Sequence, residues 1–421
     1  MRRPIICILS AILISACNAS DAAIGVNERD TDRQAVNPPG SFVRVDLGTL
    51  GGASSYATGI NNSGVVVGWS QTSGGETHAF RWTGSAGMVD LGTLPGDRAS
   101  RAIAILDTQN SGDAEILGVS GDGTNWAPVV WTASGAITRL EVPSPQEFST
   151  RLPTAFNSQG EVVGWDAADG YQHGWIWSAE DGEFDLSTNL SAKRGEGSAA
   201  AITASGRVLL TTASTSCART LECWRTYVWT KGSGYAPLGT PTVDGEANVT
   251  GLDLNDLGTV VGWASIGSGG SPTPYTWSAA HGFRLLAHYT TGANQYGYAT
   301  AVNSGASVVG ADFDPATGSI VASFWSPVGG ITKLSSGDSN PSVAIGINDL
   351  GTVAGWATVA AGANHAVVWR PGSTAGSNLV APTTIALVRV APKSTTCLTS
   401  ASAVLSRHAM FDCVAKADRL R

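Results

Sequence analysis

A tryptophan recurs at a nearly constant interval along most of this chain. The successive intervals are 49, 46, 52, 48, 48 and 44 residues. A repeat of this length fits one supersecondary unit of four short strands, which is the size of a β-propeller blade. The seven markers are Trp82, Trp131, Trp177, Trp229, Trp277, Trp325 and Trp369. The sequence therefore predicts an all-β protein, a single seven-bladed β-propeller of four-stranded antiparallel blades over residues 42–381. We expect the marker tryptophans to be structural, each packing its blade against a neighbour.

A turn motif precedes the second segment of each unit. Its full form is Asn-x-x-Gly, with shortened or altered forms at 110–112, 203–206 and 303–305. Asn and Gly both tolerate the positive φ that a tight hairpin loop requires. The full forms are Asn61 to Gly64, Asn157 to Gly160, Asn255 to Gly258 and Asn348 to Gly351. Each marker thus has its own hairpin upstream, which supports the count of seven.

The segments on either side of this turn differ in composition. After the turn come runs such as Val65–Trp69 that are apolar on both faces, as expected for a strand covered on both sides. Before the turn, small residues alternate, as at Ala57 and Gly59. Only small side chains fit where inner strands converge on an axis, so we predict that this first segment lines the central channel.

Two short motifs carry a family resemblance. The triplet His78-Ala79-Phe80 has a near copy at 365–367, and Asp-Leu-Gly-Thr-Leu stands at 46–50 and 90–94. These residues resemble the HAF family of probable extracellular repeats, bacterial surface proteins expected to fold as β-propellers. The resemblance covers roughly residues 42–370 and is weakest in blades two, four and six, which lack the Gly-Trp pair and the His. The family has no established catalytic residues, so the resemblance implies fold and location rather than activity.

The N-terminus has the pattern of an exported lipoprotein. Residues 1–16 combine a basic start with a short apolar run, and the segment ending at Cys17 resembles a bacterial lipobox, in which Cys17 would be acylated. The alternative is an ordinary signal peptide cut nearby. The run is too short to remain as a membrane span. Asn18 favours the outer membrane. We therefore expect a cell-envelope lipoprotein, at the outer membrane or cell surface, anchored through Cys17.

The ends of the repeat array predict how the ring closes. Residues 17–41 are polar and are predicted to form a lipidated flexible tether. Residues 42–50 have the composition of an outermost strand, yet they precede the first blade. We predict that they complete the last blade, the one that contains Trp369; the alternative is that Ser377 to Ala381 supplies that strand. Residues 382–421 do not repeat and form a C-terminal tail, with a short helix as a possible element.

Cysteine and charge limit the partners. Outside the leader and Cys17, four cysteines form two close pairs in sequence, Cys217 with Cys223 and Cys397 with Cys413. In an exported protein this predicts two local disulfides, with free thiols or a metal site as alternatives. Removing Arg2 and Arg3 with the leader leaves 23 basic against 33 acidic residues, a net charge of −10. This balance argues against nucleic-acid binding. A monomer is expected.

The candidate ligand-binding residues follow from loop positions. In propellers these usually lie between second and third strands and between blades, which are the segments that vary most in this chain. The second-to-third segments carry Trp126, Asp166, Asp169, Tyr171, Trp224, Asp312 and Asp314, and the blade-linking segments carry Tyr56, Asp97 and Tyr296. Aromatic and acidic groups together at one channel mouth suit a glycan, a peptide or a cation.

The sequence favours binding over catalysis. No Ser/His/Asp set, nucleotide loop or zinc motif stands out, so we assign no catalytic residue, metal ligand or cofactor. His78, His173 and His365 each lie four residues before their marker and are expected to form hydrogen bonds within their blades. We predict a binding or adhesion module for an extracellular glycan, peptide or protein. The alternative is a secreted polysaccharide hydrolase or lyase that uses loop carboxylates.

Overall fold

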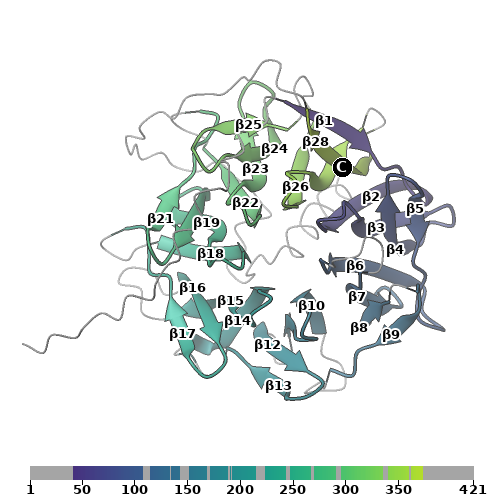
Figure 1. The fold of residues 1–421 in the computed structure, drawn as a ribbon, viewed down its shortest axis with the longest axis horizontal. Coiled ribbons are helices and arrows are strands. Elements are labelled where there is room, and N and C mark those ends of the chain that lie inside the picture. Colours follow the sequence, from purple (N-terminus) through teal and green to yellow (C-terminus); the bar gives the residue numbers. More distant parts are fainter. Residues whose placement is uncertain are drawn as a thin grey trace, which may run out of the picture. The chain divides into compact units, whose positions relative to one another are not determined.

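The structure is a computed structural model. It describes residues 41–107, 114–132, 134–142, 151–167, 171–187, 190, 192–214, 223–242, 247–266, 270–290, 295–334, 340–359 and 362–372. These residues form seven four-stranded antiparallel sheets arranged in a ring (Figure 1). Within them no helix is long and apolar enough to cross a bilayer. The predicted seven-bladed propeller is confirmed.

Each blade runs outward from the strand nearest the centre of the ring (Figure 1). Blade 1 consists of β2 (Gly51–Ile60), β3 (Val66–Thr72), β4 (Thr77–Thr83) and β5 (Gly87–Asp90). Blade 2 consists of β6 (Ala99–Ile105), β7 (Ile116–Gly121), β8 (Trp126–Trp131) and β9 (Ile137–Arg139). Blade 3 consists of β10 (Arg151–Phe156), β11 (Val162–Asp166), β12 (His173–Ser178) and β13 (Gly182–Asp185). Blade 4 consists of β14 (Ala192–Ile202), β15 (Val208–Ser214), β16 (Cys223–Thr230) and β17 (Gly234–Pro237). Blade 5 consists of β18 (Ala247–Leu254), β19 (Val260–Ile266), β20 (Thr273–Ser278) and β21 (Gly282–Leu285). Blade 6 is β22 (Gly297–Val302), β23 (Val308–Asp314), β24 (Ser319–Trp325), β25 (Ile331–Lys333), and blade 7 is β26 (Ser342–Ile347), β27 (Val353–Thr358), β28 (Asn364–Pro371) with β1 (Phe42–Asp46).

The N-terminal strand closes the ring, as predicted. β1 pairs antiparallel with β28, placing Arg44 opposite Trp369. The strand is shorter than the predicted 42–50, because Leu47 to Leu50 turn inward and lead into β2. The side chain of Phe42 packs on Phe324 of blade 6 with ring centroids 5.3 Å apart, while Leu47 is buried in the cluster that contains Phe80 of blade 1. β1 and the residue that follows it therefore connect blade 7 to both of its neighbours. The alternative closing strand, 377–381, lies outside the described residues.

The marker tryptophans share one register. In all seven blades the marker pairs with the residue that follows the hairpin and opens the second strand. The pairs are Val66 with Trp82, Ile116 with Trp131, Val162 with Trp177, Val208 with Trp229, Val260 with Trp277, Val308 with Trp325 and Val353 with Trp369. Trp131 Nε1 donates a 2.8 Å hydrogen bond to the Leu91 carbonyl of the preceding blade, and Trp325 Nε1 donates one to Ala287 O. Five markers are buried, whereas Trp177 and Trp277 are half-buried.

A β-bulge marks every inner strand. The register between first and second strands skips one residue in each blade. The skipped residues are Thr58, Ile103, Thr154, Ala200, Leu252, Thr300 and Ile345. Where this residue is Thr, its hydroxyl links two blades, as Thr58 Oγ1 does to Val67 O and to Ala102 O of the next blade. A bulge bends a strand and re-aims its side chains, here towards the channel.

The Asn turns connect neighbouring blades through side-chain hydrogen bonds. Asn348 Nδ2 donates to the Asn61 carbonyl of blade 1 at 3.1 Å, while Asn348 Oδ1 accepts from the Thr352 N–H of its own turn at 2.9 Å. The same donation to the next blade joins Asn61 to Leu106, Asn157 to Thr203, Asn255 to Asn303 and Asn303 to Asn348. The Asn residues therefore stabilise both the hairpin and the contact between blades.

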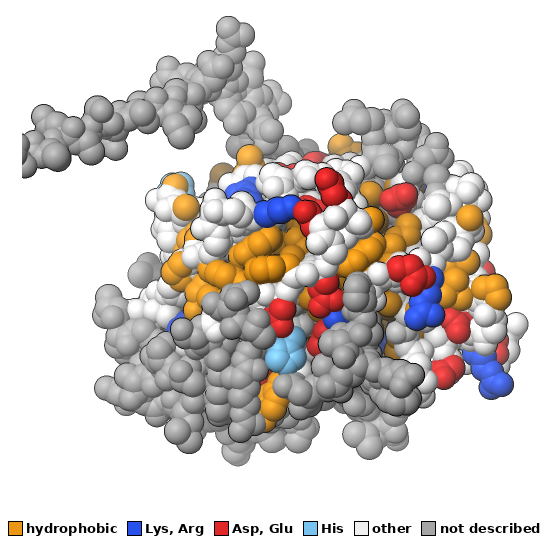
Figure 2. Space-filling model, turned by 90° about the horizontal axis from the view of Figure 1, so that it is seen from below, with side chains coloured by type: hydrophobic (Ala, Val, Ile, Leu, Met, Phe, Trp, Pro, Cys, Tyr) orange, Lys and Arg blue, Asp and Glu red, His pale blue; other side chains and the backbone are white. Residues whose placement is uncertain are grey.

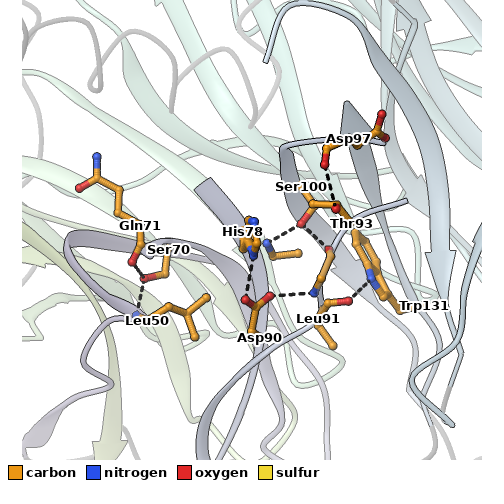
Figure 3. A network of polar contacts seen from close by, with 12 residues as sticks. Leu50, Ser70, Gln71, His78, Asp90, Leu91, Thr93, Asp97, Ser100 and Trp131 are labelled. Carbon is orange, nitrogen blue, oxygen red and sulfur yellow. Dashed lines mark hydrogen bonds and ion pairs between the residues drawn. The ribbon is translucent and has the colours of Figure 1, made fainter. Parts of the chain in front are cut away.

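The two resemblance motifs form one unit in space. His78 Nδ1 lies 2.8 Å from Asp90 Oδ2 (Figure 3), and His365 Nδ1 lies 2.9 Å from Asp46 Oδ2. The predicted hydrogen bonding within the blade is thus confirmed for these two histidines. In both copies the Asp also accepts from the N–H of the motif glycine, and the final Leu N–H donates to a serine: Leu50 to Ser70 and Leu94 to Ser120, both at 2.9 Å. The motifs thus hold an outer strand to its own blade and to the next.

The rim is partly apolar. Hydrophobic side chains show between acidic and basic ones on the side of the ring near β13 and β17 (Figure 2). Phe184 of β13 is 43% exposed and stacks on Trp229 of blade 4 with centroids 5.6 Å apart. An exposed ion pair, Lys231 Nζ to Asp181 Oδ2 at 2.7 Å, joins the same two blades. Exposed pairs of this kind contribute little to stability.

Candidate functional site

Most of the predicted ligand-binding residues lie in strands rather than in loops. The second and third strands extend further than their composition suggested, so these side chains pack between blades. Tyr56, Trp126, Asp166, Trp224, Asp312 and Asp314 belong to β2, β8, β11, β16 and β23. Asp97, Tyr171 and Tyr296 lie in connecting segments, and Asp169 lies outside the described residues. The nine described positions do not gather at one point.

The first cluster joins blades 1, 2 and 3, and we call it the aromatic shelf: Trp69, Arg101, Trp126 and Trp165. The Arg101 guanidinium lies over two indoles, 5.0 Å from the Trp69 ring centroid and 5.2 Å from that of Trp126. Trp126 opens β8 directly after the loop between second and third strands. Arg101, Trp126 and Trp165 are half-buried, so each presents part of its surface to solvent. Stacking on two indoles fixes the position of the planar guanidinium.

Trp165 extends the shelf into blade 3. It packs with Trp126 against the buried residues Ile103, Val119 and Leu152. Its Nε1 atom is buried and has no acceptor among the described residues. A buried donor without a partner costs about 1–3 kcal/mol, so an oxygen from a water or a ligand at this position would be favourable. The apolar residues packed under Trp126 and Trp165, together with the polar Trp165 Nε1 group, suit an amphipathic ligand.

A second aromatic set lies across blades 5, 6, 7 and 1. Tyr56 stacks on Trp69 with centroids 4.3 Å apart and meets the edge of Trp356 at 5.9 Å. Its hydroxyl accepts from Asn364 Nδ2 at 3.0 Å. Tyr296 and Tyr298 form an edge contact at 6.1 Å, and burial raises the pKa of Tyr298 well above its usual range. Tyr56 and Tyr298 are buried, so this set forms core between blades rather than an open surface.

The predicted carboxylate Asp166 belongs to a buried ion cluster in blade 3. Arg151 Nη2 donates to Asp166 Oδ2 at 2.8 Å and to Glu183 Oε1 at 3.0 Å, and its Nη1 also contacts Glu183. The guanidinium lies 5.2 Å from the Trp175 ring centroid. Burial raises the pKa of Asp166, and the charge of Arg151 offsets part of that rise. Two acidic groups share one buried cation, which holds β10, β11 and β13 together.

Asp312 and Asp314 belong to a corresponding cluster in blade 6. His288 Nδ1 lies 2.5 Å from Asp312 Oδ1, and the Tyr289 N–H donates to Asp312 Oδ2 at 2.9 Å. Burial raises the pKa of Asp312, and the hydrogen bond with His288 acts in the opposite direction. Lys333 Nζ contacts Asp314 Oδ2 at 2.5 Å. Asp312 occupies the same position in its second strand as Ser120 does in blade 2. The hydrogen bond from the Tyr289 N–H to Asp312 therefore corresponds to the one from the Leu94 N–H to Ser120.

These contacts define what the carboxylates can do. Asp166, Asp312 and Asp314 are buried and ion-paired, and they stand in two separate blades. Asp97 Oδ2 accepts from Ser120 Oγ at 2.7 Å. Among the described residues no group of three or more His, Cys, Asp and Glu is placed to hold a metal ion. The carboxylates therefore act as structural partners, and the shelf is the cluster that offers free surface.

The key residues Arg101 and Arg151 were absent from the sequence-based candidates. Arg151 lies 15 positions from Asp166 and 32 from Glu183, so only the blade register brings the three together. A signal for the shelf did exist. The Gly-Trp pair occurs in blades 1, 3, 5 and 7 only, and this irregularity separates Trp69 and Trp165 from the markers that repeat in every blade.

The glycine of the Gly-Trp pair has a purely steric role. A Cβ on Gly68 would lie 2.0 Å from the Tyr56 carbonyl oxygen, and equally close approaches occur at Gly262 and Gly355, and also at Gly310 of blade 6, which precedes Ala311 instead of a tryptophan. Because this steric requirement concerns only the glycine, the residue that follows it can differ between blades, as a ligand-binding residue would.

The cysteine predictions fall largely outside the described residues. Cys223 is buried at the start of β16, but Cys217, Cys397 and Cys413 are not among the described residues. Both disulfides stay predictions. Cys17 and the whole leader also lie outside this range.

Comparison of the sequence with protein-family models and with curated proteins finds no match. Among solved structures, a streptogramin B lyase is similar with a TM-score of 0.49 and 11% identity, covering 79% of this chain and 98% of that one. The β-propeller domain of the Trilobed protease from Pyrococcus furiosus has a TM-score of 0.48 and 10% identity, over 75% and 95% of the two chains. An oligogalacturonate lyase in complex with manganese has a TM-score of 0.48 and 11% identity, over 80% and 97%. These likenesses carry no argument about activity. The class is that of the seven-bladed β-propellers, a fold that serves as a binding or scaffold module in general.

Proposed function

We propose that this protein is a cell-envelope-anchored binding module of the HAF-repeat type, which engages an extracellular glycan, peptide or protein through the aromatic shelf. The observation that carries the proposal is the stacking of Arg101 between Trp69 and Trp126, with part of each of Arg101 and Trp126 accessible. Trp and Arg in such arrangements supply a large share of binding energy at protein interfaces. A sugar ring can likewise stack on the half-buried indole of Trp126 or Trp165.

The hydrolase or lyase alternative is less well supported. It needs two carboxylates that face a common substrate at a suitable spacing. Asp166, Asp312 and Asp314 instead contact the side chains of Arg151, His288 and Lys333, respectively. A rigid ring that presents a stacked aromatic surface is better suited to recognition than to turnover.

Glycan-array binding with matched variants tests the shelf. Trp126→Ala removes one side of the Arg101 stack, and Trp224→Ala removes the residue at the same register position in blade 4. We expect Trp126→Ala to abolish binding and Trp224→Ala to leave it unchanged, with both proteins folded by circular dichroism. Loss of binding in Trp224→Ala alone would place the site in another sector. Release of shortened products from bound polysaccharides would favour the enzyme alternative.

Membrane attachment is tested separately. Cys17→Ser should move the protein from the detergent phase to the aqueous phase in a phase-partitioning experiment, because it removes the proposed acylation site. If the unaltered protein already partitions into the aqueous phase, the lipoprotein proposal is wrong, whereas the shelf proposal is unaffected.

A further inference from the structure

The tryptophan of each Gly-Trp pair meets the inner strand of the following blade, and at three of these junctions a large side chain covers the indole. The pairs are Trp69 with Arg101 at 5.0 Å, Trp356 with Tyr56 at 5.9 Å, and Trp263 with the apolar cluster that contains Tyr298. The covering residue has the same register position in each case, because it lies opposite Trp69 or the equivalent residue of the second strand. The residue at this position of one blade therefore decides how far the indole of the preceding blade is covered.

The junction between blades 3 and 4 departs from this pattern. Trp165 faces blade 4, because it lies opposite Gly174 in the ladder and a Cβ on Gly174 would be 3.1 Å from the Ala199 nitrogen of β14. In blade 4 the residue at the covering position is Ser198, which lies opposite Thr211. A serine is much smaller than an arginine or a tyrosine. The register thus leaves the half-buried indole of Trp165 without the cover that the other three indoles have.

Three buried polar atoms at this junction have no hydrogen-bond partner in the part of the chain that the structure describes. They are Trp165 Nε1, Gln172 Oε1 and Ser198 Oγ. Ser198 is only 1% exposed. Gln172 lies against the same strand of blade 4, because its carbonyl oxygen accepts a 2.6 Å hydrogen bond from the Gly197 N–H. Buried polar groups in native proteins are almost always hydrogen-bonded, so three such groups at one junction indicate a polar molecule bound between them.

The chemistry of the three atoms selects an uncharged molecule. An indole N–H can only donate, an amide oxygen can only accept, and a hydroxyl can do either. A sugar hydroxyl also donates and accepts, so it can satisfy each of these groups. A charged group in such a buried place would need a counter-charge. The guanidinium of blade 3 does not supply one, because Arg151 is already paired with Asp166 and Glu183.

We propose that the junction of Trp165, Gln172 and Ser198 is the subsite at which the aromatic shelf recognises a neutral glycan. One ring of the glycan stacks on the half-buried Trp165 indole, and hydroxyl groups of that ring bond to the three unpartnered atoms. This inference rests on the proposed function of the shelf. It narrows the ligand from a glycan, peptide or protein to an uncharged carbohydrate.

Isothermal titration with cellohexaose, xylohexaose and mannohexaose tests the inference, with a cationic glucosamine hexamer and an anionic guluronate hexamer for comparison. Ser198→Tyr places at this junction the residue type that covers the indoles of Trp356 and Trp263. We expect at least one neutral hexasaccharide to bind the unaltered protein more tightly than both charged ones. Ser198→Tyr should abolish that binding without lowering the melting temperature.

A second pair of variants leaves the junction uncovered. Trp165→Phe keeps an aromatic ring and removes the N–H, so it should weaken the binding of the neutral hexasaccharide about threefold to tenfold, which is the effect of one neutral hydrogen bond. Trp263→Phe is the matched control. It removes an equally buried N–H without an acceptor in blade 5, where Tyr298 covers the indole, and it should bind as the unaltered protein does.

Unchanged binding by both Ser198→Tyr and Trp165→Phe would overturn the inference and show that the three atoms hold only ordered water. So would preference for a charged hexamer, or no binding of any of the three neutral hexasaccharides. The shelf proposal would still stand in these cases if Trp126→Ala abolishes binding of whichever ligand the glycan array identifies. Binding that survives in Trp126→Ala would instead contradict the shelf proposal on which the inference rests.

Discussion

At the scale of single residues, the same motif residue has different energetic weight in different blades. Trp131 is fully buried and donates to Leu91 O, whereas Trp177 is half-buried. Truncating a buried tryptophan leaves a cavity and removes its transfer energy. The marker register is identical in both blades, so burial and the indole hydrogen bond are the variables.

Trp131→Ala should lower the free energy of unfolding by about 3–5 kcal/mol, and Trp177→Ala by clearly less. Urea denaturation followed by circular dichroism measures both. Trp131→Phe, which keeps most of the volume but loses the bond to Leu91 O, should fall between the unaltered protein and Trp131→Ala. Equal losses for Trp131→Ala and Trp177→Ala would show that burial does not determine the contribution of the marker.

The Lys333–Asp314 pair makes stability depend on pH in a defined direction. Burial raises the pKa of Asp314, but the hydrogen bonds from Lys333 Nζ and the Ala316 N–H outweigh it, so the pKa lies below its usual value near 3.9. A lowered folded-state pKa stabilises the fold above the unfolded-state pKa, and this contribution is lost as pH falls through the folded-state pKa.

Lys333→Gln should therefore be less stable than the unaltered protein at pH 7, and the difference should shrink as the pH falls through the folded-state pKa of Asp314. Urea midpoints at pH 7 and at a series of lower pH values measure this. Lys231→Gln is the control, because its partner Asp181 is exposed and the pair contributes little. A Lys333→Gln deficit that does not change with pH would contradict the role of this ion pair.

At the scale of elements, the hairpin turns connect blades as well as strands. Asn348 is buried, and its amide serves the Asn61 carbonyl of blade 1 and the Thr352 N–H of its own turn. Removing it leaves the half-buried Thr352 N–H without a partner and takes away one of the two hydrogen bonds to the Asn61 carbonyl, which still accepts from the Gly64 N–H. Each unsatisfied group costs about 1–3 kcal/mol.

Asn348→Ala should accordingly lower the free energy of unfolding by about 1–3 kcal/mol. Ser304→Ala serves as the control, because Ser304 contributes its backbone N–H to Asp349 and that bond survives the substitution. We expect a change within about 0.5 kcal/mol for the control, measured by urea denaturation. Similar values for both variants would show that the hydrogen bonds of the Asn348 side chain do not contribute to stability.

The elements show why the fold was more predictable than the site. The marker, the Asn turn and the small inner segment recur in nearly every blade, so each copy supports the assignment of the others. The pairing of His78 with Asp90 is repeated by His365 with Asp46, and the repetition itself indicates a contact within the blade.

The site residues have no such repetition. Arg101, Arg151 and His288 occur once each, and their partners are set by the register between strands and the packing between blades. The bulge on each inner strand shifts that register by one residue, which composition does not reveal. The carboxylates predicted to face a ligand are therefore partners of Arg151, His288 and Lys333.

At the scale of the whole molecule, the central claim is a seven-bladed ring that depends on its N-terminal strand. β1 pairs with β28 over five positions, and Phe42 and Leu47 are buried against blades 6 and 1. Each backbone hydrogen bond contributes about 0.5–1.5 kcal/mol net, and each buried apolar side chain about 1.5–3 kcal/mol. Without β1, blade 7 would expose an unpaired edge, which is prone to aggregation.

Melting temperatures of two truncated proteins test this claim most directly. Deleting residues 18–37 removes only sequence that precedes the ring and is predicted to form a tether, so the melting temperature should not change. Deleting residues 18–50 removes β1 as well, and it should lower the melting temperature sharply or cause aggregation. Equal melting temperatures for the two proteins would contradict closure by β1 and would point to residues 377–381 as the closing strand.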